Sequence, residues 1–214
     1  DYILTTDRNL VSVVDFKVTD SVLRISTNME VTSAKALTVY LKLQNPKHVI
    51  LKNDSDLETP GQIEVPEFTV TAASSSEIDV NLTTTKSQIN LRENAKGQLN
   101  IRTEQLEVKM SDRTDLKGKF TAQSAQVNMG GSAEFNPRGK TASLNLALTG
   151  KADYKGDDFD SKNASATLSD RSNAAVSAEE SLSVFAQDKA VINVYGKPDI
   201  SVKALNDDAQ INKK

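Results

Sequence analysis

Hydrophobic and polar residues alternate through most of this chain, and similar seven-residue segments interrupt the alternation at regular intervals. Ahead of one such segment, for example, Leu106, Val108 and Met110 occupy every second position. A period of two indicates short strands that turn one face inward. No window keeps the period of 3.6 residues that is typical of helices. The pattern therefore predicts an all-β protein.

The seven-residue segment occurs nine times. Its copies are LKNDSDL at 51–57, AASSSEI at 72–78, LRENAKG at 91–97, MSDRTDL at 110–116, MGGSAEF at 129–135, LTGKADY at 148–154, LSDRSNA at 168–174, AQDKAVI at 186–192 and LNDDAQI at 205–211. Successive copies begin 18 to 21 residues apart, most often 19. A repeat this short cannot bury its own apolar face, so it must stack on its neighbours. We therefore predict a parallel β-helix, a solenoid with rungs of about 19 residues, and the usual hand of parallel crossovers makes it right-handed.

Two positions of the segment indicate a turn. The third position holds Asn53, Ser74, Asp112, Gly131, Gly150, Asp170, Asp188 and Asp207, with Glu93 as the exception. Gly, Asn and Asp tolerate the left-handed backbone that a sharp corner often requires. The fifth position is small in every copy: Ser55, Ser76, Ala95, Thr114, Ala133, Ala152, Ser172, Ala190 and Ala209. Small side chains stacked in a column allow close packing at this corner.

The repeat also predicts how each rung is built and which residues meet in the core. A rung has room for three short strands and three bends, with further bends expected at Gly-containing segments such as Lys117-Gly118 and 136–139. Two core stacks are expected, Val108 with Val127 and Leu146, and Leu116 with Phe135 and Tyr154. The alternation breaks parity at Leu205, which indicates a one-residue bulge there.

Residues 1–46 lack the seven-residue segment but contain alternating stretches typical of strands. We expect them to form the first rungs or a cap over the open end of the stack, since exposed strand edges invite aggregation. Residues 47–214 then form the repeat β-helix, and no linker separates the two parts, so both are expected in one domain. The chain opens in the middle of the pattern, so a segment is expected upstream.

Composition excludes several classes of function. The formal net charge is −3, which has the wrong sign for a nucleic-acid binder with a basic surface. No apolar run approaches the ~20 residues that span a bilayer. The chain has no Cys, which excludes disulfides and thiolate metal ligands. We expect no cofactor and no bound metal.

Several of these features together are similar to a known family. The segments MSDRTDL, MGGSAEF, LTGKADY and LSDRSNA, followed by Tyr195-Gly196-Lys197-Pro198, resemble the tandem Ser-Gly-Ser-Gly-Asp repeats and closing Tyr-Gly-Asn-Pro element of the head GIN domain, a family labelled "putative autotransporter adhesin". The stretches 9–14 and 17–25 resemble its opening segment. The resemblance covers nearly the whole chain and implies a right-handed β-helix on secreted or surface proteins of Gram-negative bacteria. It implies no catalytic residues, and the turns depart from the family because charged pairs such as Asp-Arg replace Gly-Ser.

A row of acidic residues is one candidate site. Asp115, Glu134 and Asp153 hold the sixth position in successive copies, close enough to repel one another or to share a hard cation. The alternative is a solvated ladder of ion pairs, in which the cations come from the fourth position. Those cations are Arg113, Lys151, Arg171 and Lys189. Because surface ion pairs are common and individually weak, we favour the ion-pair ladder.

An acidic segment and the histidine are two further candidate sites, and each has a simpler interpretation. Asp157-Asp158-Phe159-Asp160 is acidic but lacks the spacing of an EF-hand calcium loop, so a polar loop is the favoured interpretation. His48 is the only histidine, which excludes zinc motifs that need a His pair. It is out of phase with the inward Val49, so its side chain is expected to face solvent.

These observations favour a non-catalytic binding or structural module outside the cytoplasm, in the periplasm, on the outer-membrane surface or secreted. The expected partner is a glycan or an envelope protein, through the acidic row and its flanking cations, and not nucleic acid or membrane. The alternative is an enzyme acting on polysaccharides, a lyase or a hydrolase, because such enzymes also use β-helices. The uniform length of the repeats argues against the long loops that usually form their clefts.

Overall fold

The computed structural model covers residues 1–214 and divides into two compact units, residues 1–44 and residues 45–214. Strands make up nearly all of the regular structure, and one short 3₁₀ helix is the only helical element. No helix is long and apolar enough to cross a membrane. The predicted all-β class is confirmed.

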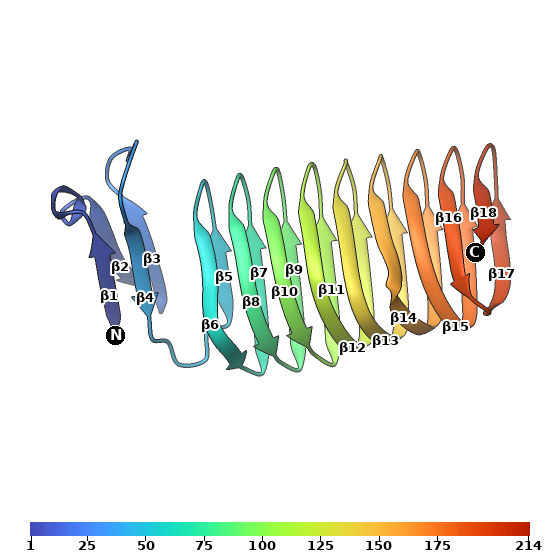
Figure 1. Cartoon of the computed structure of the whole chain (residues 1–214), viewed down its shortest axis with the longest axis horizontal. Coiled ribbons are helices and arrows are strands. Elements are labelled where there is room, and N and C mark those ends of the chain that lie inside the picture. Colours follow the sequence, from blue (N-terminus) through green and yellow to red (C-terminus); the bar gives the residue numbers. More distant parts are fainter. The chain divides into compact units, whose positions relative to one another are not determined.

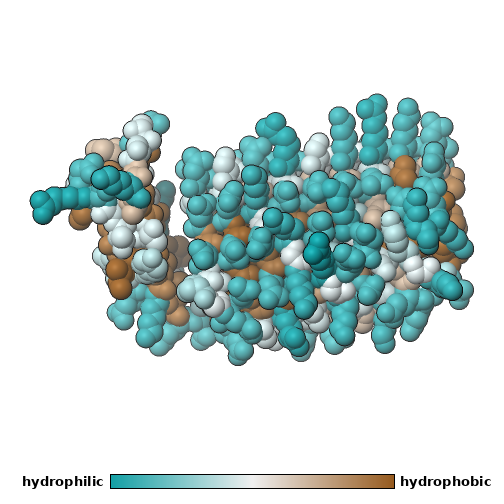
Figure 2. Space-filling view, in the orientation of Figure 1, coloured by the Kyte–Doolittle hydropathy of each residue, from teal (hydrophilic) through white to brown (hydrophobic).

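The first unit contains two antiparallel strand pairs and the 3₁₀ helix η1 (Arg8–Leu10). β1 (Tyr2–Thr6) pairs with β4 (Leu37–Leu41), and β2 (Val14–Thr19) pairs with β3 (Val22–Thr27). Only Leu10 and Val13 are buried among its apolar residues, and many others are exposed (Figure 2). That this unit caps the β-helix or forms its first rungs, in one domain with it, stays a prediction.

The second unit is a solenoid of about nine turns in which the strands form two parallel ladders (Figure 1). Its strands are β5 (His48–Leu51), β6 (Asp56–Glu64), β7 (Glu67–Ala72), β8 (Glu77–Thr83), β9 (Lys86–Leu91), β10 (Lys96–Arg102), β11 (Gln105–Met110), β12 (Asp115–Met129), β13 (Glu134–Leu148), β14 (Asp153–Leu168), β15 (Asn173–Ala186), β16 (Val191–Gly196), β17 (Asp199–Leu205) and β18 (Gln210–Lys213). Ladder A consists of β6, β8, β10, the first halves of β12 to β15, β16 and β18. Ladder B consists of β5, β7, β9, β11, the second halves of β12 to β15, and β17. The predicted solenoid with rungs of about 19 residues is confirmed.

Each rung has two strands, so the prediction of three strands and three bends is wrong. The Gly-containing segments expected to bend lie inside the long strands β12 and β13. Gly118 and Gly139 have φ values of 150° and 114°. A Cβ atom on them would lie 1.8 Å from the carbonyl oxygen of Leu99 and 2.2 Å from that of Phe120. Glycine is therefore required here for the close approach of neighbouring rungs, and it does not mark a corner.

The turn from ladder B to ladder A is the same in every rung. All nine residues at the third position of the segment have positive φ, between 58° and 72°. Glu93, the exception by residue type, follows the others with a φ of 65°. The small fifth-position residues are buried in the seven central copies, as at Ala95, Ala133 and Ala152. The predicted turn and its column of small residues are confirmed.

The core lies between the two ladders and contains the two predicted stacks. Val108, Val127 and Leu146 are in register on ladder B, and Leu116, Phe135 and Tyr154 are in register on ladder A. All six are at most 1% exposed. Phe135 packs edge-to-face against Phe120 and Tyr154, with ring centroids 5.4 and 5.8 Å apart. The Tyr154 hydroxyl has no hydrogen-bond partner, and burial raises the pKa of this phenol.

Two further features concern the bends of the rungs. Thr84, Thr103 and Thr141 are buried where ladder A passes to ladder B, and each hydroxyl lies within hydrogen-bond distance of two backbone carbonyls of that bend. This column was not predicted, although its members are 19 and 38 residues apart. The predicted bulge near Leu205 is confirmed, because Val184 pairs with Val202 while Phe185 pairs with Ala204.

Candidate functional site

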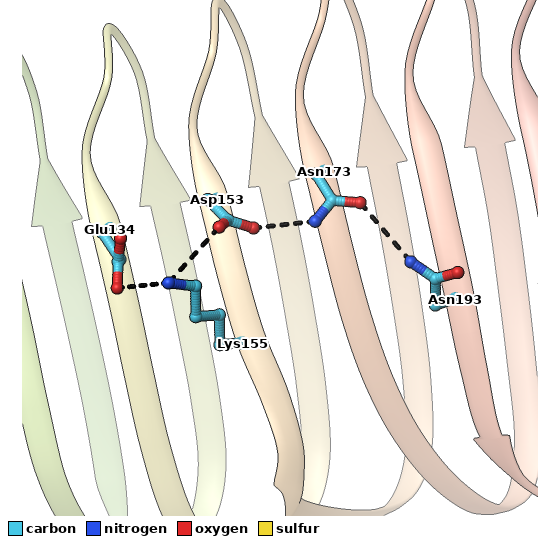
Figure 3. Close-up of polar contacts among 5 residues, drawn as sticks. All are labelled: Glu134, Asp153, Lys155, Asn173 and Asn193. Atoms are coloured by element: carbon cyan, nitrogen blue, oxygen red, sulfur yellow. Dashed lines mark hydrogen bonds and ion pairs between the residues drawn. The ribbon is translucent and has the colours of Figure 1, made fainter. Parts of the chain in front are cut away.

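The acidic row on ladder A has the predicted register. Asp115 pairs with Glu134, and Glu134 with Asp153, in three successive rungs. Lys155 connects two of these acids, because its Nζ donates a hydrogen bond to Glu134 Oε1 and lies 3.6 Å from Asp153 Oδ2 (Figure 3). The hydrogen bond to Glu134 raises the pKa of the Lys155 ammonium group, and the nearby charges of Glu134 and Asp153 act in the same direction. The ion-pair ladder is therefore the correct interpretation for Glu134 and Asp153.

The cations of this ladder differ from the predicted ones. Arg113, Lys151, Arg171 and Lys189 form no ion pair with the row. The Arg113 Nε instead donates a hydrogen bond to Asn94 Oδ1, at 3.1 Å. Lys155 takes their place because it lies two residues after Asp153 on the same outward face of β14. No group of three or more His, Cys, Asp or Glu side chains is arranged to hold a metal ion.

Amide side chains continue the polar row beyond the acids. Asn173 Nδ2 donates to Asp153 Oδ1 at 2.8 Å, and Asn193 Nδ2 donates to Asn173 Oδ1 at 3.5 Å (Figure 3). Asn212 Nδ2 extends the chain of contacts to Asn193 Oδ1 at 3.4 Å. Glu134 and Asp153 are thus occupied by contacts within the protein, whereas the Asp115 side chain has none. The row is therefore a poor candidate for binding a partner.

The acidic segment 157–160 is not a loop, so that interpretation is wrong. It lies within β14, and Phe159 is 1% exposed. Gly156 pairs with Val176 and Asp160 with Ser177, so β14 contains three more residues than β15 at this point. Asp157 and Asp158 are exposed there, and Asp158 Oδ2 lies 3.8 Å from Arg138 Nε. Asp160 accepts a hydrogen bond from the Ser177 hydroxyl at 2.9 Å.

His48 is exposed, as predicted. It is the first residue of β5, and its Nε2 lies 3.5 Å from Thr71 Oγ1. No carboxylate accepts a hydrogen bond from it, so the structure does not assemble a Ser-His-Asp triad around this residue.

The outward face of ladder B carries no charge over four consecutive rungs, and ten of its twelve outward side chains there are polar. Its twelve outward positions in β12 to β15 alternate with buried residues such as Val127 and Leu146. They are Ser124, Gln126, Asn128, Ser143, Asn145, Ala147, Asn163, Ser165, Thr167, Ser181, Ser183 and Phe185. The first halves of β12 to β14 present charged residues outward instead. We call these twelve residues the neutral face.

A groove of about 620 Å³ overlaps one side of the neutral face. One wall consists of outward residues from five successive rungs, Thr71, Asn90, Lys109, Asn128 and Ala147. The buried residues Met110 and Met129 also line it, and the groove runs across the strands. It combines an apolar floor with amide and hydroxyl groups and with two cations, Arg92 and Lys109. An apolar pocket with a few polar groups is typical of ligand-binding sites.

Sequence reasoning missed the neutral face, although the sequence carried a signal for it. Positions 19 or 20 residues apart, such as Gln126, Asn145 and Ser165, share the same uncharged chemistry. From β12 to β14, outward charged residues occur in the half of each repeat that forms ladder A and are missing from the half that forms ladder B.

Comparison with known proteins gives a family and a fold. The model of a family described as "Putative auto-transporter adhesin, head GIN domain" matches residues 2–100 and 87–198. No curated protein matches the chain.

Three solved structures are similar over the whole chain. Two are described as putative adhesins, from Parabacteroides merdae (TM-score 0.68, 14% identity) and Parabacteroides distasonis (TM-score 0.65, 15% identity). The third is described as a putative lipid binding protein from Parabacteroides distasonis (TM-score 0.68, 15% identity). The match covers 100% of this chain and 82%, 83% and 83% of the three structures in that order. At this identity the likeness shows the fold alone.

Proposed function

Since this chain belongs to the head GIN domain family, described as "Putative auto-transporter adhesin", we propose that it is a non-catalytic binding module that attaches to glycans through ladder B. The family description and the names of the similar structures support an adhesin-like role. The finer statement, that the ligand is an uncharged glycan, rests on the neutral face.

The chemistry of the neutral face carries this proposal. Its serine, threonine, asparagine and glutamine side chains offer hydrogen-bond donors and acceptors without charge, which complements the hydroxyl groups of a sugar. Phe185, which is 38% exposed, adds an aromatic ring at one end of the face. Amphipathic sugar rings stack on such exposed rings. The side chains stand on central strands above a packed core, so little conformational entropy is lost on binding.

The groove gives the glycan a place to lie. Its wall presents one outward side chain at each rung, about 4.8 Å apart, so a linear chain laid across the strands meets a hydroxyl group, two amides and a cation in turn. Binding is then distributed over several rungs, and each single contact is weak. The proposed location is outside the cytoplasm, on the cell surface or secreted, as the adhesin family supports. Detection of the protein on intact cells by antibody labelling tests the location.

A glycan array with two matched variants tests the ligand. Ala147 and Ala175 are both half-buried outward alanines, Ala147 in the groove on ladder B and Ala175 on ladder A. We expect the wild-type protein to bind at least one uncharged glycan. Ala147→Tyr should weaken this binding at least 10-fold by filling the groove, and Ala175→Tyr should change it less than 2-fold.

Four outcomes contradict the proposal. If no uncharged glycan bound, the proposed ligand would be wrong. Capture of an envelope protein instead would indicate that the module is a scaffold. Equal effects of the two tyrosine variants would show that the groove is not the site. Release of shorter saccharides by the purified protein would support the alternative of a polysaccharide lyase or hydrolase.

A further inference from the structure

The charged residues of ladder A are sorted into bands. Six exposed cations project from β10, β12 and β13, and one of them, Lys96, pairs with Glu77. The other five are Arg102, Lys117, Lys119, Arg138 and Lys140. We call them the basic band. Acidic residues lie around it, with Glu77 and Asp79 on β8, Asp157, Asp158 and Asp160 on β14, and Asp115 and Glu134 at the starts of β12 and β13. The strand pairing places these five strands side by side in ladder A.

Strand register brings the basic side chains together. Lys119 pairs directly with Arg138 on the next rung, so their side chains emerge about 5 Å apart. Lys117 lies two residues from Lys119 on the same strand, and Lys140 two residues from Arg138, both on the outward face. Arg102 and Lys140 flank Thr121 in a second row. One anionic group at the Lys119–Arg138 pair therefore has further cations on either side.

Most of these charges have no partner within the protein. Arg102, Lys117, Lys119 and Lys140 form no ion pair, and Arg138 has only the contact of 3.8 Å with Asp158. Like charges held this close repel one another, so the arrangement is unfavourable in the free protein. An anion bound between them relieves that repulsion.

The backbone beneath the band is closely packed. The motifs Lys117-Gly118-Lys119 and Arg138-Gly139-Lys140 each place a glycine of positive φ between two cations. Each glycine touches the backbone of the preceding rung, and Phe120 is fully buried below the band. The cations are thus fixed at their bases while their ends remain free to adjust to a ligand.

From these observations we infer that the basic band binds an anionic saccharide, one that carries carboxylate or sulfate groups. The band is three rungs wide, about 10 Å between the outer strands, which suits a single chain lying along the strand direction. A membrane surface fits poorly, because it would also cover the acidic bands and be repelled by them. This surface is on the ladder opposite the neutral face, and the inference does not depend on the proposed function.

The test uses defined saccharides and a charge-matched control. The probes are a heparin-derived hexasaccharide for sulfate, an oligogalacturonate for carboxylate and dextran as the uncharged control, each measured by calorimetry at 50 and 300 mM NaCl. We expect at least one anionic probe to bind, and its affinity should be at least 10-fold weaker at the higher salt concentration. Dextran should not bind this surface. Lys119→Gln/Arg138→Gln should weaken binding at least 10-fold. Lys151→Gln/Lys189→Gln removes the same charge at exposed turn residues and should weaken it less than 2-fold.

Each other outcome overturns the inference. Equal loss in the two double variants, with unchanged thermal melts, would show that net charge alone attracts the probes. Stronger binding to phosphatidylglycerol vesicles than to either anionic saccharide would identify a lipid surface instead. A dimer in sedimentation that dissociates in Lys119→Gln/Arg138→Gln would show that a second copy occupies the band. The groove variant Ala147→Tyr should bind the anionic saccharide as tightly as the wild type does. Failure of this inference can therefore be distinguished from failure of the proposed function.

Discussion

The carboxylate of Asp112 accepts a hydrogen bond from the backbone N–H of Glu93, 3.2 Å away in the preceding rung. The same contact recurs from Gly150 to Asp170, from Asp170 to Asp188 and from Asp188 to Asp207. An aspartate at the third position of the segment therefore does two things. It adopts the left-handed backbone of its own turn, and it satisfies an amide of the neighbouring turn.

This contact predicts a pH dependence of stability. Hydrogen bonds from Ser111 and from the Glu93 amide lower the pKa of Asp112 below its ordinary value of 3.8. Because the pKa of Asp112 is lower in the folded state, its ionised carboxylate contributes to stability above pH 3.8. This contribution is lost as the pH falls through the pKa of Asp112 in the folded state. Asp112→Asn keeps the backbone preference but not the charge. We expect its melting temperature to lie below that of the wild type at pH 7, with the difference shrinking toward pH 2. A difference that is constant across this range would contradict the assignment.

Glycine at position 118 should be irreplaceable. Its φ is 150°, and a Cβ atom would lie 1.8 Å from the Leu99 carbonyl oxygen. We expect Gly118→Ala to lower the free energy of unfolding by about 3 kcal/mol or more, because backbone strain and a steric clash act together. Gly61→Ala is the matched control, since nothing lies within 4 Å of its added Cβ. Urea denaturation of both variants measures the difference, and equal effects would show that the rungs do not approach so closely at Gly118.

The core stack predicts a strong effect at Val127. This residue is 1% exposed and lies between Val108 and Leu146. We expect Val127→Asp to destabilise the solenoid by about 3 kcal/mol or more, because an unpaired carboxylate is buried. Gln126→Asp places the same group one residue earlier on the exposed face and should leave the melt nearly unchanged. Similar melts for the two variants would mean that the inward face of β12 is misassigned.

Removal of the acidic row should leave the fold intact. We expect replacement of Asp115, Glu134 and Asp153 by Ala to change the free energy of unfolding by about 1 kcal/mol or less, because exposed ion pairs contribute little. The pKa of Lys155 is raised above 10.5 by its pairing with Glu134 and Asp153. This pairing therefore contributes to stability below pH 10.5, and the contribution is lost as the pH rises through the pKa of Lys155 in the folded state. Melts from pH 7 to pH 12 should therefore converge for the two proteins. Loss of the folded signal in the triple variant at pH 7 would contradict this prediction.

Much of the solenoid can be predicted from the sequence, because the sequence contains two independent periodic patterns. The period of two assigns each residue to the inward or outward face, and the period near 19 aligns rungs, so the register of Val108 with Val127 could be predicted. The division of a rung into two strands could not. Glycine permits both a bend and a close backbone approach, and the pattern alone does not separate the two causes at Gly118.

The candidate sites were less predictable, for a similar reason. Asp157 and Asp158 are residues typical of loops, but the strand continues past them, because Phe159 is buried and pairs with Gly139. The repeat predicts the partner of Glu134 among the turn cations, whereas Lys155 reaches it from the same outward face one rung later. Contacts between rungs depend on side-chain length and direction, which position numbers do not supply.

The column of turn contacts also has a direction. In each contact the carboxylate belongs to the later rung and the amide to the earlier one, as with Asp188 and Asp170. The two ends of the stack are therefore chemically unequal. A rung removed from the C-terminal side takes with it the acceptor of the turn before, whereas a rung removed from the N-terminal side leaves only an exposed carboxylate that water solvates. Synthesis delivers the rungs from the N-terminal side, so each newly made rung that carries one of these aspartates completes the turn made just before it.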